Sequence, residues 1–157
     1  MEYYFNELDP KSFQRLINAI LVARVGEDIR ITPLSGQDGG RDSETATDNP
    51  YMQFEILKTN VKKARRPWLS PVRPGKYVFQ SKFHRTTDAR PVDVRSRVLS
   101  EFSAELRDNI IPAHSKDRIT YFFLVTNVSG SRDALVKLDE VRRNVLQGIE
   151  GLHADIW

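Results

Sequence analysis

Apolar positions along the chain recur with two different periods, and each period predicts one kind of element. Apolar residues three or four positions apart predict amphipathic helices, and apolar residues at every second position predict strands with one buried face. The predicted order is helix, three strands, helix, strand, helix and strand. This order favours an α/β fold with a central mixed sheet flanked by helices. The helices are expected at 10–25, 98–110 and 135–145, and the strands at 28–34, 41–47, 76–84, 118–128 and 152–157.

Capping residues mark the expected ends of these helices. Asp9 followed by Pro10 is typical of a helix start, and Gly26 marks the end of the same helix. The second helix should stop before Pro112, because the residue preceding a proline disfavours helical geometry. Ser131 is the expected N-cap of the last helix.

The last two predicted strands differ in their surroundings. Residues 118–128 form the most apolar run of the chain and are rich in β-branched and aromatic side chains, so we expect a strand that is buried on both faces. The closing residues 152–157 resemble the beginning of another strand. We therefore interpret 1–157 as a single domain, the N-terminal part of a longer multidomain protein. The alternative is a native terminus with a docked Trp157.

Composition narrows the class of protein. A length of 157 residues suits one ordinary domain, and 39% hydrophobic with 29% charged residues is typical of globular chains. No apolar run approaches the roughly 20 residues that a membrane span requires. The chain contains no cysteine, which excludes disulfides and thiolate metal sites. We expect a cytoplasmic protein.

Charge is distributed unevenly along the chain. Residues 58–97 contain twelve Lys and Arg against two Asp, a net charge of +10, whereas the remainder carries −7. Such asymmetry favours a densely negative partner, and nucleic acid is the first candidate. The alternative is a solvated basic loop that serves only solubility. Within this region, 48–75 is read as a basic, proline-containing insertion.

Three polar residues suggest a site. Asp42 closes the glycine-containing stretch "SGQDGGRD" just before a predicted strand. Gln80 and Lys82 lie two residues apart in the strand at 76–84, so their side chains share one face. Lysine is rarely buried without a partner, and a carboxylate such as Asp42 is its natural partner here. Metal-assisted hydrolysis of a phosphodiester needs such a set, because oxygen ligands hold Mg²⁺ and a lysine stabilises developing charge.

These residues carry a family resemblance. "SGQDGGRD" followed by "VFQSKFH" resembles the split motif of the PD-(D/E)xK nuclease superfamily, in its Mrr-like restriction endonuclease branch with Gln-x-Lys as the second half. The resemblance extends along most of the chain. It implies a restriction-endonuclease-like core, Mg²⁺ (with Mn²⁺ as a substitute) as cofactor, and Asp42, Gln80 and Lys82 as catalytic residues. The metal ligands would be Asp42, Gln80 and the backbone carbonyl of Ser81.

One position departs from the family pattern. Many relatives carry a glutamate on the first helix in a Phe-Glu pair, whereas this chain has Phe13 and Gln14. The auxiliary role would then be unfilled or taken by Gln14 or Glu7. Asp38 is a further auxiliary candidate, although an aspartate in a turn more often bonds its own backbone.

The resemblance and the charge together predict a function. We expect a Mg²⁺-dependent endonuclease that cuts double-stranded DNA with little sequence specificity. Similar domains are the effectors of bacterial antiphage ATPases of the STAND class, so regulatory ATPase domains and a homo-oligomer are expected partners. The alternatives are a catalytically inactive DNA-binding or sensing module and a charge-paired assembly domain. The expected DNA contacts are Lys62, Lys63, Arg65, Arg66, Arg73, His84 and Arg85.

Overall fold

The computed structural model describes residues 8–25, 29–31, 42–45, 75–85 and 90–157. The predicted order of helices and strands is confirmed in these ranges. The insertion expected at 48–75 lies outside them, apart from Gly75. The elements are α1 (Pro10–Val25), β1 (Ile29–Ile31), β2 (Ser43–Thr45), β3 (Lys76–Lys82), α2 (Pro91–Glu105), a π-helical turn (Leu106–Ile110), α3 (Ile111–Asp117), β4 (Ile119–Thr126), α4 (Arg132–Val145) and β5 (His153–Ile156).

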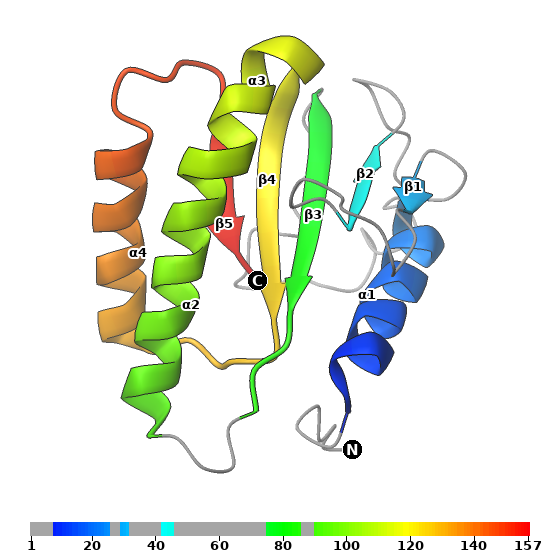
Figure 1. Ribbon diagram of the computed structural model, residues 1–157, viewed down its shortest axis with the longest axis vertical. Coiled ribbons are helices and arrows are strands. Elements are labelled where there is room, and N and C mark those ends of the chain that lie inside the picture. The colour runs from blue at the N-terminus through cyan, green and yellow to red at the C-terminus, as the bar shows by residue number, and fades with distance from the viewer. Residues whose placement is uncertain (1–7, 26–28, 32–41, 46–74, 86–89) are drawn as a thin grey trace, which may run out of the picture.

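The strands form one mixed sheet in the spatial order β1-β2-β3-β4-β5. β1, β2 and β3 pair antiparallel, and β3, β4 and β5 pair parallel. β3 therefore lies at the centre, with an antiparallel neighbour on one side and a parallel neighbour on the other (Figure 1). The expected α/β class with a mixed sheet is confirmed.

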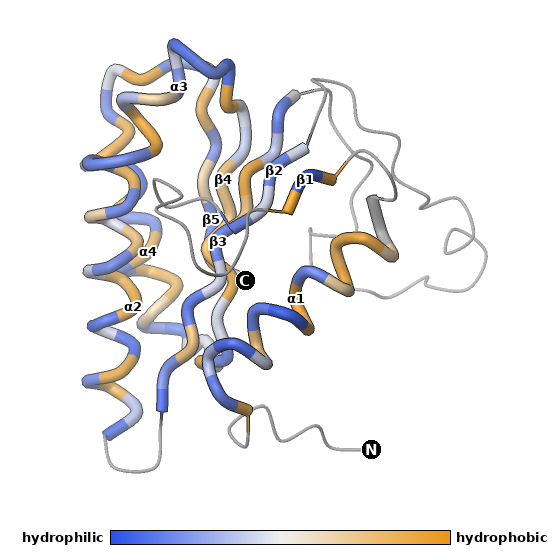
Figure 2. Tube along the Cα trace, turned by 45° about the vertical axis from the view of Figure 1, so that its right-hand side comes forward, coloured by the Kyte–Doolittle hydropathy of each residue, from blue (hydrophilic) through white to orange (hydrophobic). Residues whose placement is uncertain are grey.

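Helices cover both faces of this sheet, and the cover is unequal. α2, α3 and α4 pack on one face over a core that includes Val78, Phe102 and Phe122, each fully buried. α1 packs on the other face, where Leu21 contacts a smaller cluster with Tyr77. Figure 2 shows hydrophobic and hydrophilic positions alternating along α2 and α4, as in helices with one buried side.

The first helix begins where its capping residues predict. The Asp9 carboxylate accepts hydrogen bonds from the backbone N–H groups of Lys11 (2.8 Å) and Ser12 (2.9 Å) and from the Ser12 hydroxyl (2.7 Å). These bonds satisfy donors that have no partner inside the helix. At the start of α4, the expected N-cap is also confirmed, since Ser131 Oγ accepts from the Ala134 N–H at 3.2 Å.

The expected helix end before Pro112 is wrong. A proline inside a regular α-helix lacks its N–H and collides with the carbonyl four residues earlier. Here the Ile111 N–H donates to the Leu106 carbonyl, five residues back, and this wider π-turn leads into α3. Pro112 then occupies the first turn of α3, where a missing N–H is tolerated.

β4 is buried more completely on one face than on the other. Phe122 and Leu124 face α2 and α4 and are fully buried, whereas Tyr121 and Phe123 on the opposite face are only partly buried. The expectation of burial on both faces therefore holds for one face only. On this second face α1 packs beside β1 and β3, and the rings of Tyr77 on Tyr121 and of Phe79 on Phe123 stack into an aromatic layer.

The closing residues pair with β4 as a parallel strand. β5 lies beside β4, and Trp157 continues the pairing by donating its N–H to the Leu124 carbonyl at 2.8 Å. The indole ring lies 4.0 Å from the Phe123 ring, measured between centroids, and 5.9 Å from the Phe79 ring. Trp157 is thus part of the aromatic layer. Within the described ranges, no helix has the length and apolarity needed to cross a membrane.

Candidate active site

β3 presents two polar side chains on the sheet face that α2 covers. Alternation along the strand directs Val78, Gln80 and Lys82 to this face and Tyr77 and Phe79 to the face covered by α1. Gln80 is 5% exposed, although the strand around it is otherwise apolar. The sequence correctly predicts that Gln80 and Lys82 share a face.

A glutamate on α2 joins these two side chains. Glu105 Oε1 accepts a hydrogen bond from Gln80 Nε2 at 3.1 Å and lies 3.3 Å from Lys82 Nζ. Its other oxygen, Oε2, accepts from Asn109 Nδ2 at 2.6 Å. The carboxylate beside Lys82 is therefore Glu105, whereas the sequence favours Asp42 as its natural partner.

The oxygen atom of the Gln80 amide has an unusual environment. Gln80 Oε1 is buried and has no hydrogen-bond partner in the ranges that the structure describes. Buried polar atoms are nearly always hydrogen-bonded, so an unpaired oxygen indicates strain or a missing ion or water. An amide oxygen is a ligand that Mg²⁺ accepts. This atom fits the metal that the sequence predicts.

Asp42 lies immediately before β2, at the side of β3. Its N–H donates to the Phe79 carbonyl at 3.0 Å, and its carboxylate Oδ2 accepts from the N–H (2.5 Å) and the hydroxyl (2.6 Å) of Ser81. The side chain is buried, with 9% exposure. Asp42 is thus fixed to the residue between Gln80 and Lys82.

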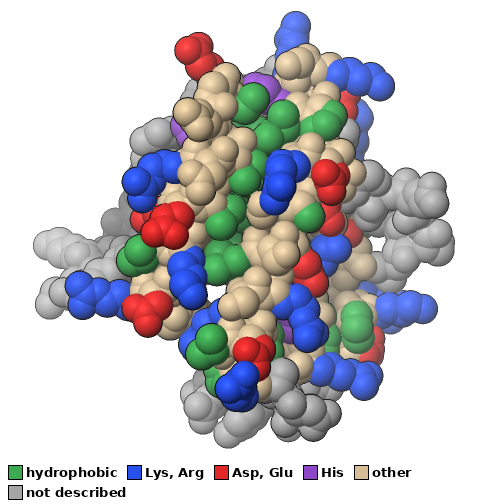
Figure 3. Space-filling model, turned by 60° about the vertical axis from the view of Figure 1, so that its left-hand side comes forward, with side chains coloured by type: hydrophobic (Ala, Val, Ile, Leu, Met, Phe, Trp, Pro, Cys, Tyr) green, Lys and Arg blue, Asp and Glu red, His purple; other side chains and the backbone are tan. Residues whose placement is uncertain are grey.

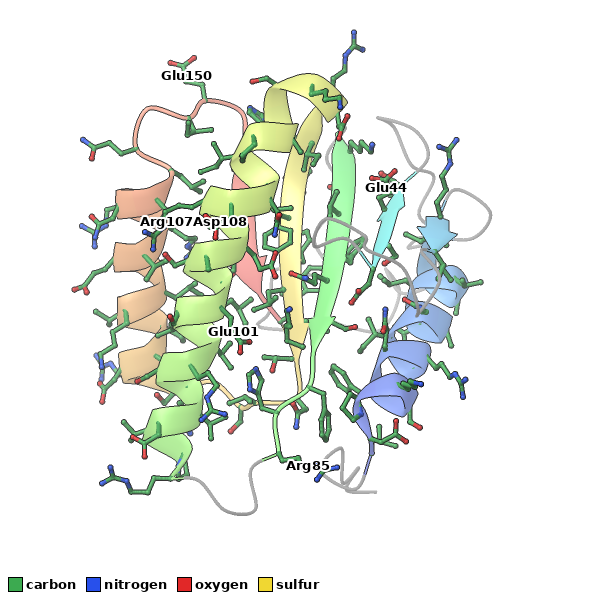
Figure 4. All side chains as sticks on the ribbon, in the orientation of Figure 1. Glu44, Arg85, Glu101, Arg107, Asp108 and Glu150 are labelled. Carbon is green, nitrogen blue, oxygen red and sulfur yellow. The ribbon has the colours of Figure 1, made fainter. Side chains whose placement is uncertain are left out.

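His84, just beyond the end of β3, and Glu101 on α2 form a second polar pair. His84 Nε2 lies 3.2 Å from Glu101 Oε2, but the two atoms are not aligned for a hydrogen bond, and both are buried. The His84 backbone is held by Asn127, whose Oδ1 accepts from the N–H and whose Nδ2 donates to the carbonyl, each at 2.8 Å. The side chain expected to contact DNA is therefore buried against α2. Figure 4 shows Glu101 on α2 and Arg85 beyond the end of β3.

The other predicted site residues lie apart from this group or outside the described ranges. Gln14 is on α1, which packs on the opposite face of the sheet from Gln80 and Lys82, so the structure does not bring it to them. Arg85 is exposed, as a DNA contact requires. Glu7, Asp38, Lys62, Lys63, Arg65, Arg66 and Arg73 lie outside the described residues.

Sequence reasoning missed the two glutamates of α2. Glu101 and Glu105 are one helical turn apart and each directly neighbours a buried apolar position, Phe102 and Leu106 respectively. Glutamates flanking an apolar stripe on an amphipathic helix usually reach solvent, so the pattern carries no distinguishing signal. Only the packing of α2 on β3 shows that they meet polar strand residues.

The side chains at this site limit which cation it can hold. In the described ranges, no three His, Asp or Glu side chains gather as a metal site. A cation here would rely on one carboxylate, amide and carbonyl oxygens and water, a set suited to Mg²⁺.

A separate shallow groove of about 350 Å³ lies between α2 and α4, and its lining includes Arg107, Val141 and Asn144. Figure 3 shows the molecule from this side, with hydrophobic side chains in a stripe between charged ones.

Comparison with protein-family models, with curated proteins and with solved structures finds no match to this chain. The residues around β3 are therefore the basis for a proposal about function.

Proposed function

We propose that the chain is a Mg²⁺-dependent endonuclease domain with a restriction-endonuclease-like core, which hydrolyses phosphodiester bonds of double-stranded DNA with little sequence specificity. The observation that carries this proposal is the unpaired, buried oxygen of Gln80. It lies on the same strand face as the Lys82 ammonium group, and the next residue, Ser81, bonds the Asp42 carboxylate. A role as the effector of an antiphage protein fits this activity.

Each residue has a distinct role in this proposal. Asp42, Gln80 and the Ser81 carbonyl would hold the metal, and Lys82 would orient the attacking water or neutralise charge on the phosphate. Mg²⁺, when bound, polarises the phosphate and lowers the pKa of a coordinated water. Lys82 suits its role because its side chain is 35% exposed, which leaves the ammonium group accessible to a phosphate.

Positive charge supports DNA as the substrate. The 58–97 region carries the chain's excess positive charge, and Arg85 is exposed just beyond the end of β3. Phosphate contacts of this kind give affinity without sequence specificity. Cleavage is therefore expected at many positions of a duplex.

Plasmid cleavage tests the proposal directly. Supercoiled DNA is incubated with the wild-type chain in Mg²⁺ or in excess EDTA, with Lys82→Ala, and with Lys137→Ala as a control. Lys137 is exposed on α4, so its loss removes the same charge away from β3. Nicking is expected only for the wild type and Lys137→Ala in Mg²⁺. Cleavage by Lys82→Ala, or cleavage in EDTA, would overturn the mechanism.

A second candidate function is a DNA-binding module without catalysis. It is favoured by the contacts in the structure, since Ser81 holds the Asp42 carboxylate and Glu105 pairs with Lys82. Calorimetric titration with Mg²⁺ separates the two functions. A nuclease should release or absorb heat that Asp42→Asn abolishes, whereas an inactive module should show no Asp42-dependent signal.

A further inference from the structure

Glu105 contacts both Gln80 and Lys82 through a single oxygen atom. We propose that Glu105 is a positioning residue that turns the Gln80 oxygen toward a metal ion and holds the Lys82 ammonium group beside it. This inference rests on the proposed nuclease function and adds to it a residue from α2.

The chemistry of an amide explains the orientation. A glutamine side chain has a donor end and an acceptor end of nearly the same shape, so its neighbours decide which end points where. An ionised carboxylate only accepts hydrogen bonds. Glu105 therefore engages the Nε2 end of Gln80, at 3.1 Å, and leaves Oε1 as the free atom.

The negative charge of Glu105 also favours a cation beside Gln80. Gln80 is a neutral ligand at a position where a carboxylate would attract a cation more strongly. Glu105 supplies that negative charge one hydrogen bond further from the metal, in a side chain that is only 15% exposed. Partners in this position typically orient metal ligands and raise their basicity.

Asn109 fixes Glu105 in turn. Asn109 lies one helical turn beyond Glu105, and its Nδ2 donates a hydrogen bond to Glu105 Oε2 at 2.6 Å. Both oxygens of the carboxylate are thereby engaged, one by Asn109 and the other by Gln80 and Lys82. The carboxylate is held in one orientation before any metal arrives.

Glu105→Gln tests the inference, with Glu101→Gln as the matched control. Glu101 is one turn earlier on α2 and contacts His84 rather than Gln80. The substitution at 105 removes the negative charge and supplies an NH₂ group that can donate a hydrogen bond. The Gln80 amide can then flip, so that Oε1 points toward residue 105 rather than toward a metal. By calorimetry with MgCl₂, Glu105→Gln should weaken Mg²⁺ binding roughly 10- to 100-fold. Glu101→Gln should leave the affinity within about twofold, because Glu101 contacts His84 and, in the described ranges, makes no hydrogen bond or ion pair with Gln80.

A double substitution distinguishes positioning from a merely structural role. Gln80→Glu combined with Glu105→Gln exchanges the carboxylate and the amide. A carboxylate then faces the metal, and the amide at position 105 hydrogen-bonds to that carboxylate on the side away from the metal. Compared with Gln80→Glu alone, the double variant should lose little or no Mg²⁺ affinity, because either oxygen of a carboxylate can face the metal and no orienting partner is needed. If Glu105 only stabilises the fold, Glu105→Gln should change the affinity by the same factor in the wild-type and the Gln80→Glu backgrounds.

Each outcome has a definite meaning. Wild-type affinity in Glu105→Gln overturns the positioning role and leaves the nuclease proposal intact. A wild type that neither binds Mg²⁺ nor cuts DNA overturns the nuclease proposal, and the inference falls with it. If Glu105→Gln does not fold, Asn109→Ala frees Glu105 Oε2 without touching Gln80 or Lys82. Its affinity should fall roughly tenfold, and an unchanged affinity would contradict the inference.

Discussion

The Asp42 carboxylate accepts two hydrogen bonds from Ser81, one from the backbone N–H at 2.5 Å and one from the hydroxyl at 2.6 Å. The two residues are 39 positions apart in the sequence. Their bonds fasten the start of β2 to β3, on the residue between Gln80 and Lys82. The two halves of the predicted motif are therefore joined through Ser81.

Ser81→Ala should lower the free energy of unfolding by about 1.5–3 kcal/mol, the typical contribution of a hydrogen bond to a charged group. The backbone bond remains, so the loss should be partial. Urea denaturation of the wild type, Ser81→Ala, Asp42→Ala and the double variant measures the coupling between the two side chains. Strictly additive effects would show that the hydroxyl does not bond Asp42 in solution.

Arg85→Ala should weaken DNA binding and reduce its salt dependence. Arg85 is exposed beyond the end of β3, and removing one phosphate interaction should reduce the log–log salt slope by about 0.9. The weakening should be similar for duplexes of different sequence. Fluorescence anisotropy at several salt concentrations measures the slope.

Lys137→Ala is the control for Arg85→Ala, because it removes an equal charge from the exposed side of α4. It should leave the slope unchanged. Equal changes in slope for the two variants would indicate that only net charge matters and that Arg85 makes no specific phosphate contact.

Local sequence signals predict most of the fold. Asp9, Pro10 and Ser131 mark helix starts because capping depends on bonds within one turn. Alternation from Tyr77 to Lys82 predicts the two faces of β3 because side chains of a strand alternate regardless of context. These features are local, and the structure agrees with them.

The features that sequence reasoning missed depend on tertiary packing. Pro112 signals a helix end, but a π-turn closed between Ile111 and Leu106 carries the helical path past it. Lys82 signals a carboxylate partner, and the sequence favours Asp42, which is not the residue beside it in the structure. Glu105 becomes that partner because α2 packs on β3, and no periodicity in the sequence distinguishes it from a solvent-exposed glutamate.

Asn127→Asp should destabilise the end of β3. The Asn127 amide donates to the His84 carbonyl and accepts from the His84 N–H, each at 2.8 Å, so it links the ends of β3 and β4. A carboxylate keeps the acceptor but places a second oxygen against the carbonyl. A loss of about 1–3 kcal/mol in the free energy of unfolding is expected, measured by urea denaturation.

Asn144→Asp serves as the control for Asn127→Asp, since Asn144 is exposed on α4. It should change stability by no more than about 0.5 kcal/mol. A similar effect of both substitutions would mean that the Asn127 bonds contribute nothing beyond the added charge.

The N-cap of α1 predicts a pH-dependent contribution to stability. Hydrogen bonds from the Ser12 hydroxyl and N–H hold the pKa of Asp9 below its ordinary value of 3.8. A carboxyl group whose pKa is lower in the folded state stabilises the fold above its unfolded pKa. That contribution is lost as the pH falls through the lower, folded pKa.

Asp9→Asn separates the charge from the cap, because asparagine also caps helices well but does not ionise. The wild type should be the more stable protein at neutral pH, and its advantage should disappear as the pH falls below 3.8. Urea denaturation at a series of pH values measures the difference, and the ¹³C shift of the Asp9 carboxyl reports its pKa directly. Ser12→Ala should move that pKa back toward its ordinary value, because the Ser12 hydroxyl makes the largest contribution to the shift. A stability difference that stays constant with pH, together with an unshifted carboxyl in the wild type, would show that Asp9 does not cap α1 in solution.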